Sequence, residues 1–367
     1  MDIFSLLGLA KAEGASDLHL VACSPPLIRV NGQIKPVEDM PSLTAEDMEQ
    51  AFNQLTSEKQ KTDFHHNLEL DFGCDVPDVG RVRCNAARQR GTVSLVIRLL
   101  PSVIPAIDDL GVPEVCKELV LKRRGLVVVS GPTGSGKSTT LAAMVDHLNH
   151  VEGRRVVTIE DPIEYVYTSA NSTITQRELG SDTLSFAEAL RHVLRQDPDI
   201  ILVGEMRDLE TAATALTVAE TGHLVLTTGH APSAAQAIDR IIDLFPPHER
   251  HMAQSQLASL IIGVLCQALV PKADGSGRAA AVEVMLANAA VKNLIREGKS
   301  YQLPNAIRMH TQLGMQLLDQ ALMNLYRQGS ISKESVLSFC NDRDEIVKLI
   351  GDDKISASSF LDPTFIG

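Results

Sequence analysis

The order of apolar and polar residues divides the chain into two parts of different character. Up to about residue 98, short runs that alternate between apolar and polar side chains, such as "PPLIRVNGQIKPV" and "VGRVRCNAARQ", are separated by turn signals. A short amphipathic helix accompanies them. This pattern predicts a small α+β domain over residues 1–98.

Beyond Leu126 the pattern changes to near-continuous apolar runs that alternate with helical segments. The runs "LVVVS", "RRVVTIE", "DIILVGE" and "HLVLTTG" are typical of strands buried on both faces. They predict a parallel sheet flanked by helices over residues 114–286, which ends with the strand "RAAAVEVML". Residues 287–367 are predicted to be helical, with the long segment "KESVLSFCNDRDEIVKLIG" closed by a glycine.

Residues 99–113 are predicted to link the two parts, because "PSVIPAIDDLGVP" contains three prolines and no useful periodicity. A helix "EVCKELVLKRR" is expected to start at Pro113 and to stop at Gly125, with a solvated basic trio at its C-terminus.

Composition and charge narrow the class of protein. With 367 residues, 44% apolar and 22% charged, the chain is long enough for two or three domains with proper cores. The formal net charge of −12 argues against a general nucleic-acid groove, so no nucleic acid is expected as a partner. The N-terminus lacks the basic region of a signal peptide, and the longest apolar run falls short of a membrane span, which favours a cytosolic protein. The six cysteines are far apart and form no C-x-x-C pair, as expected of free thiols.

The stretch "GPTGSGKST" matches the phosphate-binding loop motif G-x-x-x-x-G-K-[ST], with a strand before it and a helix after it as the motif requires. Glycines let backbone N–H groups turn toward phosphate oxygens, and the helix N-terminus adds its positive dipole end. Lys137 is predicted to neutralise the β and γ phosphates, and Ser138 to hold Mg²⁺. The predicted nucleotide-binding residues are Gly131, Pro132, Thr133, Gly134, Ser135, Gly136, Lys137, Ser138 and Thr139.

Hydrolysis also needs a carboxylate linked to Mg²⁺ and a group that orients water. Glu205 ends the strand "DIILVGE" and is the candidate for the Mg²⁺ shell. Glu160, Asp161 and Glu164 follow another apolar strand, where like charges repel, so a catalytic or metal role is favoured; the residues alone do not choose among the three.

Two histidines, His223 and His230, flank the strand in "TGHLVLTTGHA". A lone histidine is as often structural as functional. His230, however, stands at the carboxyl end of the strand, the ligand side of an open α/β sheet.

These motifs, in this order, resemble those of the type II/IV secretion ATPase superfamily, and most closely the PilT-like type IV pilus retraction ATPases. The resemblance covers almost the whole chain and rests on "GASDLHL", "GRVRCNAARQRG", "GPTGSGKSTT", "IEDPIEY", "LRHVLRQDPDIILVGEMRD", "TGHLVLTTGHA", "RIIDLFP", "AVKNLIREGKSYQLP" and "LGMQLLDQAL". It implies a RecA-like P-loop core, an N-terminal PAS-like α+β domain and a C-terminal helical region.

The resemblance also assigns roles to residues. It implies that Glu164 is the catalytic glutamate, that Glu205 is linked to Mg²⁺, and that His230 lies near the γ-phosphate. Arg83 and Arg98 occupy the positions of arginines that reach the phosphates, a task that suits a permanently charged guanidinium. The chain departs from the family pattern beside His230, where Gly229 and Ala231 replace the usual leucine and threonine.

The function that the resemblance implies is a Mg-dependent, homohexameric ATPase that drives type IV pilus retraction and twitching motility. Its implied place is cytoplasmic, at the inner membrane through the pilus machinery, with a PilC-like platform protein and a retraction ATPase paralogue as partners. Hydrolysis would open and close a hinge between the two parts, for which the proline-bearing linker gives independent support.

Four alternatives stay open. Within the superfamily, they are a pilus assembly or type II secretion ATPase and an accessory retraction ATPase of the PilU type. From other classes, a DNA translocase or helicase shares the P-loop core but would be stimulated by DNA, which the acidic balance disfavours. A module that binds nucleotide without hydrolysing it is disfavoured by the presence of Lys137, Glu164 and Glu205.

Overall fold

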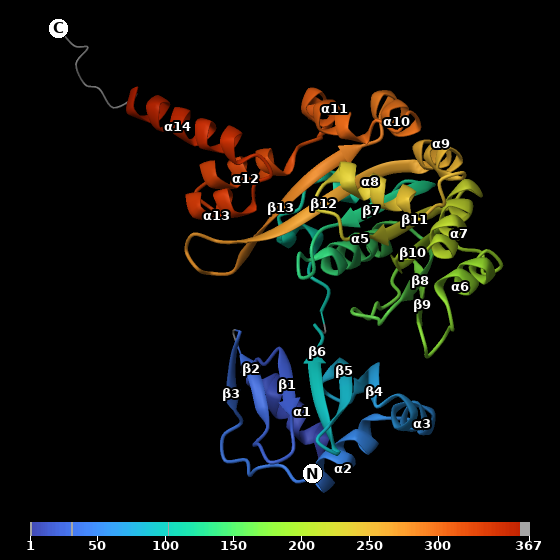
Figure 1. The fold of residues 1–367 in the computed structure, drawn as a ribbon, viewed down its shortest axis with the longest axis vertical. Coiled ribbons are helices and arrows are strands. Elements are labelled where there is room, and N and C mark those ends of the chain that lie inside the picture. The colour runs from blue at the N-terminus through green and yellow to red at the C-terminus, as the bar shows by residue number, and fades with distance from the viewer. Residues whose placement is uncertain (1, 31, 102, 360–367) are drawn as a thin grey trace. The chain divides into compact units, whose positions relative to one another are not determined.

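The computed structural model describes residues 2–30, 32–101 and 103–359. These form two compact units (Figure 1). The first comprises the described residues up to Ile104 together with Asp161–Tyr167, and the second comprises the described remainder. The chain therefore passes from one unit to the other at Ile104, inside the predicted linker, and returns briefly to the first unit after residue 160.

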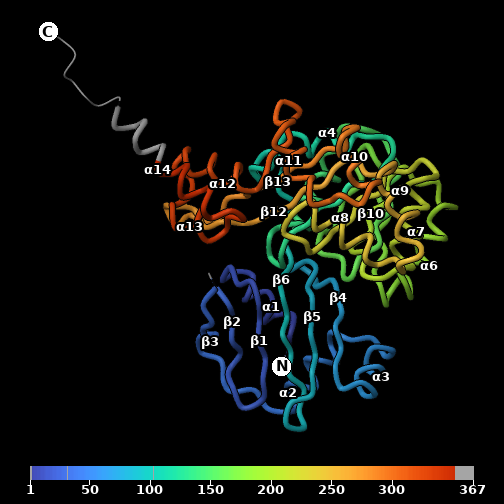
Figure 2. Tube along the Cα trace, turned by 45° about the horizontal axis from the view of Figure 1, so that its top comes forward, coloured from blue at the N-terminus to red at the C-terminus, as the bar shows by residue number. Residues whose placement is uncertain are grey.

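The first unit is a six-stranded antiparallel sheet with helices, in the strand order β3-β2-β1-β6-β5-β4. Figure 2 shows the strands side by side in this order. The strands are β1 (Asp17–Leu20), β2 (Leu27–Val30), β3 (Gln33–Pro36), β4 (Glu69–Val76), β5 (Gly80–Gln89) and β6 (Thr92–Leu99), and the helices are α1 (Ile3–Ala12), α2 (Ala45–Leu55) and α3 (Glu58–Asn67). A buried core that includes Leu18, Phe52, Phe64 and Ile97 joins the helices to the sheet.

Two helices and a strand of this unit were not predicted, namely α2, α3 and β4. Both helices begin with a capping box, in which an N-cap hydroxyl and a side chain three residues later bond to each other's backbone N–H groups. The pairs are Thr44 with Asp47, and Ser57 with Gln60. These short signals were present in the sequence, but few apolar residues follow them in α3.

The second unit contains the predicted sheet flanked by helices, which confirms the α/β core. Its strand order is β13-β12-β7-β11-β10-β8-β9, and every neighbouring pair is parallel except β12 with β13. The strands are β7 (Gly125–Ser130), β8 (Arg155–Glu160), β9 (Thr173–Glu178), β10 (Ile200–Glu205), β11 (Leu224–Thr228), β12 (Ile261–Pro271) and β13 (Arg278–Leu286). The helices among them are α4 (Val115–Val120), α5 (Lys137–Val151), α6 (Phe186–Val193), α7 (Leu209–Glu220), α8 (Ala234–Asp243) and α9 (Arg250–Leu260), after the 3₁₀ turn η1 (Ile107–Leu110).

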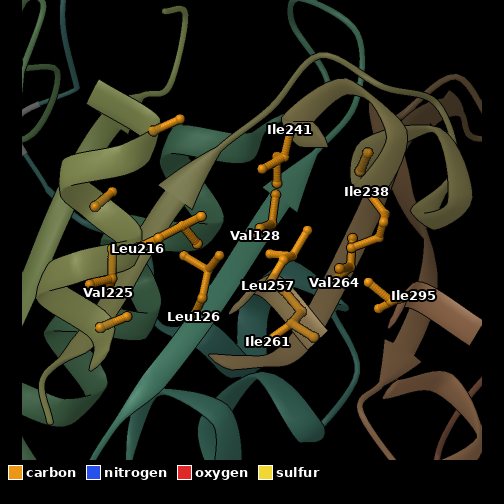
Figure 3. Packing of buried hydrophobic residues seen from close by; sticks show 14 of the residues in the cluster. Leu126, Val128, Leu216, Val225, Ile238, Ile241, Leu257, Ile261, Val264 and Ile295 are labelled. Carbon is orange, nitrogen blue, oxygen red and sulfur yellow. The ribbon is translucent and has the colours of Figure 1, made fainter. Parts of the chain in front are cut away.

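The main core of this unit lies on one face of the sheet. Leu126 and Val128 of β7 pack there with Ile238 and Ile241 of α8 and with Leu257 of α9 (Figure 3). Alternate residues of a strand point to opposite faces, so Val127 and Val129 face the other way, toward α5. The chain thus buries β7 completely between two helical layers.

The helices that follow β13 are α10 (Ala289–Arg296), α11 (Leu303–Met309), α12 (Leu318–Arg327), α13 (Lys333–Phe339) and α14 (Arg343–Ser359), with 3₁₀ turns η2 (Ser300–Gln302) and η3 (Thr311–Leu313). Helices α12 and α13 lie beside the hairpin of β12 and β13 (Figures 1 and 2). Buried apolar side chains of these helices and strands form a small core. No helix in the described ranges is both long and apolar enough to span a bilayer.

Two predicted helices were wrong in extent. The segment "KESVLSFCNDRDEIVKLIG" is broken into α13 and α14, because the Asp319 carboxylate accepts from the N–H groups of Asn341 and Asp342 at 2.7 and 2.8 Å and holds the turn between them. The helix "EVCKELVLKRR" spans only Val115–Val120. The Arg154 guanidinium binds the carbonyls of Leu121 and Lys122, each at 2.8 Å, so the basic trio follows the helix instead of ending it.

We expect Leu257→Ala to lower the free energy of unfolding of the second unit by about 2–5 kcal/mol, because the side chain is fully buried in the main core. Met252→Ala on the same helix is the matched control, since Met252 is 64% exposed, and should change it by less than about 0.5 kcal/mol. Urea unfolding monitored by circular dichroism measures both. Equal losses in the two variants would contradict the assignment of this core.

Candidate functional site

The phosphate-binding loop stands between the carboxyl end of β7 and the first turn of α5. Gly131, Gly134 and Gly136 have φ angles of 142°, 79° and 87°, which side chains with a Cβ rarely adopt. Gly136 is the N-cap of α5 and has no side chain to occupy the helix N-terminus. The free N–H groups and the dipole of this helix end make it a ready site for an anion.

Lys137 lies across this loop. Its Nζ donates to the carbonyl of Gly131 at 2.8 Å and to that of Pro132 at 3.0 Å, and the residue is only 9% exposed. Ser135, in the same loop, is 3% exposed, and its hydroxyl has no hydrogen-bond partner among the described residues. A buried hydroxyl without a partner is costly unless something binds it, and a phosphate oxygen is a group that can.

Gln267 of β12 supports the loop from the side, a role that no motif predicted. Its Oε1 accepts from the Thr140 hydroxyl of α5 at 2.8 Å, and both side chains are buried. A Cβ at Gly131 would stand 2.3 Å from the backbone oxygen of Gln267, and one at Gly136 would stand 2.9 Å from its Nε2. Gly131 and Gly136 are therefore needed for close approach of β12 as well as for their φ angles.

Glu205 and His230 come together at the carboxyl ends of β10 and β11. The Nε2 of His230 lies 3.3 Å from Oε1 of Glu205, and Arg207 donates its Nε to Oε2 at 2.7 Å. His223, at the amino end of β11, instead bonds Thr221 and the Val218 carbonyl, as a structural residue does. Of the two predicted histidines, only His230 reaches the ligand side of the sheet.

A cavity of about 460 Å³ opens beside Glu205 and His230. Its other walls come from β7, from the end of β11, from the segments that follow β10 and β11, and from α8 and the residue after it. These residues are Val128, Ser130, Met206, Arg207, Thr228, Gly229, Ala231, Ala237, Arg240, Ile241, Asp243 and Leu244. The pair faces an open space, as groups that meet water or substrate must.

The three carboxylates after β8 divide between the two units. Glu160, the last residue of β8, accepts from the Thr158 hydroxyl of the same strand at 2.6 Å and from Nε2 of Gln176 on β9 at 3.2 Å, and the second bond ties β8 to β9. Asp161 and Glu164 belong to the first unit, where Nε of Arg81 donates to the carbonyl of Ile163 at 3.3 Å. Glu164 thus shares a unit with the two candidate arginines.

Arg83 and Arg98 lie directly opposite each other on β5 and β6. On the next strand, β1, Asp17 is opposite Arg98 and accepts from its Nε at 3.0 Å. Burial alone would raise the pKa of Asp17, but hydrogen bonds from Ser16 and Arg98 and the charge of Arg98 outweigh it and lower the pKa. The structure therefore brings the two arginines together and anchors one of them to a buried carboxylate.

Oxygen donors are available for a magnesium ion. Ser138 and Glu205 stand at the carboxyl-end edge of the same sheet and offer the hydroxyl and carboxylate oxygens that Mg²⁺ prefers. Within the described part of the chain, no group of three or more His, Cys, Asp or Glu side chains is arranged to hold a metal ion. These residues fit an ion that is completed by phosphate oxygens and water, as Mg²⁺ commonly is in nucleotide sites.

Comparison with known proteins places these features in context. Residues 79–334 match the family model described as type II/IV secretion system protein. The chain is 49% identical to the type IV pilus retractation ATPase PilT of Pseudomonas aeruginosa over 335 residues, 91% of this chain and 97% of that one. It is 40% identical to the type IV pilus ATPase PilU of the same organism, over 95% of this chain and 91% of the relative. A crystal structure of the pilus retraction motor PilT with bound ADP matches with a TM-score of 0.88 and 44% identity, over 94% of this chain and 98% of that one.

We expect Gln267→Leu and Thr140→Val each to weaken ATP binding and to destabilise the second unit by about 1–3 kcal/mol, because each leaves the other's polar group buried without a partner. The double variant should lose less than the sum, with a coupling of about 0.5–3 kcal/mol. Unfolding curves and titration with a fluorescent ATP analogue measure these effects. Strictly additive losses would show that the 2.8 Å contact does not support the loop.

Proposed function

The chain belongs to the family of type II/IV secretion system proteins, and from that premise we propose that it is a motor ATPase that drives type IV pilus retraction. The observation that carries this proposal is the extent of the likeness to PilT, which covers nearly the whole of both chains. The first unit and the C-terminal helices are therefore shared as well as the ATPase core.

The protein is a P-loop ATPase that binds its nucleotide at the Gly131–Thr139 loop. In this role the backbone N–H groups of the loop and the N-terminus of α5 bind phosphate oxygens. Lys137 exchanges the carbonyls of Gly131 and Pro132 for the β and γ phosphates, where its positive charge is needed. The likeness to an ADP-bound PilT supports the nucleotide.

Magnesium is the proposed cofactor, held by Ser138 and Glu205 together with the phosphates. Bound there, it neutralises charge that develops on the phosphate oxygens during transfer. Arg207 and His230 each contact one oxygen of Glu205, and each oxygen keeps a lone pair that could bind the ion. Arg207 and His230 therefore keep the carboxylate oriented until nucleotide arrives.

The remaining roles are proposals that rest on the family pattern and on the placements above. His230 contacts the γ-phosphate region, and Glu164 activates the attacking water. Arg83 and Arg98 stabilise phosphate charge, either on the same chain or on a neighbouring copy. The register that sets the two arginines side by side on one face supports a joint role.

We further propose a homohexamer that acts at the cytoplasmic side of the inner membrane on a PilC-like platform protein. We also propose the domain division expected from the sequence: an N-terminal domain over residues 1–98, a linker over 99–113, the ATPase domain over 114–286 and a C-terminal helical region over 287–367. The likeness to PilU keeps an accessory retraction ATPase as the second candidate.

The direction of work is tested by counting surface pili on cells that lack the gene, complemented with wild type or Lys137→Ala. Excess pili that do not retract, rescued only by the wild type, are expected, because Lys137→Ala removes the charge that binds the phosphates. Purified Lys137→Ala and Glu205→Gln should both lose ATP turnover, by about 100-fold or more.

Other outcomes are equally informative. Bald cells would mean that the motor assembles pili, and an unchanged count would favour the accessory role. Full turnover by Glu205→Gln would contradict the assignment of the Mg²⁺ ligand.

A further inference from the structure

Glu283, on β13, is a buried carboxylate that the proposed mechanism does not use. It is 3% exposed, and among the described residues it has no ion pair. Burial raises the pKa of Glu283, against the effect of two backbone hydrogen bonds that lower it. Its neighbours along β13 are apolar, and burial of a charged group among apolar residues costs free energy, so the carboxylate needs a reason to be there.

The two oxygens of Glu283 hold the first turns of two different helices. Oε1 accepts from the N–H of Ala234, the first residue of α8, at 2.7 Å, and Oε2 accepts from the N–H of Leu318, the first residue of α12, at 3.2 Å. The positive dipole ends of both helices therefore meet at one negative charge. Helix α12 has Leu317 as its N-cap, which offers no oxygen, so Glu283 replaces the missing side-chain cap.

Ser130, at the end of β7, holds Ala231, three residues before Ala234 and directly after His230. Its hydroxyl donates to the carbonyl of Ala231 at 2.7 Å and accepts from the N–H of that residue at 2.8 Å. Ser130 is opposite Cys266 on β12, and Cys266 is opposite Glu283 on β13, so the two anchors stand in one row on one face of the sheet.

Residues 231–234 connect His230 directly to α8, and both ends of this short connection are thus fixed to buried groups of the sheet. Gly229, which departs from the family pattern beside His230, is compatible with the anchoring of this connection. A Cβ at Gly229 would stand 3.1 Å from the Ser130 hydroxyl, so a glycine leaves that hydroxyl free to hold Ala231. The flexibility of Gly229 is offset by the anchor on the other side of His230.

We propose that Glu283 is a positioning residue for His230, which fixes the histidine beside Glu205 and couples its position to α12. The proposal rests on the proposed function, since it assumes that His230 acts in ATP hydrolysis. A displacement of α12 at Leu318 would therefore move the Glu283 side chain, and with it the segment that follows His230.

Glu283→Gln in the full-length enzyme is the first test. The amide keeps the size of the carboxylate, but its NH₂ group cannot accept from the second helix. We expect kcat to fall about tenfold or more, while KM and ADP affinity stay within about twofold, because the phosphate loop is untouched. Hydrogen exchange should quicken at the first turns of both α8 and α12.

Matched controls separate positioning from general damage. Ser233→Ala removes the side-chain cap of α8, the 3.4 Å bond to the N–H of Gln236, and leaves Glu283 in place, so kcat should stay within about twofold. Glu283→Asp keeps the charge but is too short to reach both N–H groups, and should reproduce the loss if Glu283→Gln fails to fold. In a His230→Ala background, neither change at Glu283 should lower kcat further.

The outcomes distinguish this inference from the proposed function. Wild-type turnover in His230→Ala would contradict the proposed role of His230 in ATP hydrolysis. Loss of turnover in His230→Ala with normal turnover in both Glu283 variants would overturn the positioning role alone. A further loss on adding Glu283→Gln to His230→Ala would show that Glu283 acts by another route.

Discussion

The arrangement depends on the parallel pairing of β7 with β11 on one side and β12 on the other. All six residues of β7 are buried, so a slip in register would disrupt the packing on both faces of the strand. Its carboxyl end serves both halves of the candidate site. The chain continues from it into the phosphate-binding loop, while the hydroxyl of its last residue, Ser130, holds the segment that carries His230.

On β12, successive side chains point to opposite faces of the sheet, which separates the face that supports the phosphate-binding loop from the face on which the His230 segment is anchored. Cys266 points to the face of α8, whereas the next residue, Gln267, points to the face of α5 and supports the loop through Thr140. Buried polar groups of this kind contribute little net stability when paired, about 0.5–1.5 kcal/mol each, but cost about 1–3 kcal/mol when one partner is lost. That asymmetry favours a single arrangement of the loop over alternatives.

The parts of the site that lie in continuous sequence could be predicted, and the parts that depend on strand order could not. The phosphate-binding loop, Glu205 and His230 are each marked by a strand and the residues just after it. Gln267 and Glu283 are far in sequence from the residues they support, and they reach the loop and the segment after His230, respectively, only through the order β13-β12-β7, which involves a parallel crossover and a hairpin. The one signal for either residue in the sequence was that it is a polar residue inside an apolar strand. A single polar residue forms no periodic pattern from which its role could be predicted. Arg83 and Arg98 were identified by resemblance alone, and the register places them directly opposite each other on β5 and β6.

Assembly and retraction of a filament can use the same hydrolysis chemistry, so the direction of work has to be encoded outside the phosphate-binding loop. The proposed roles divide between the units: Glu164, Arg83 and Arg98 belong to the first, and Lys137, Glu205 and His230 to the second. Under these proposed roles a turnover requires residues of both units, which would link the chemical step to motion of the units. Glu283 adds the C-terminal helices to that link, because the carboxylate that holds His230 in place also begins α12.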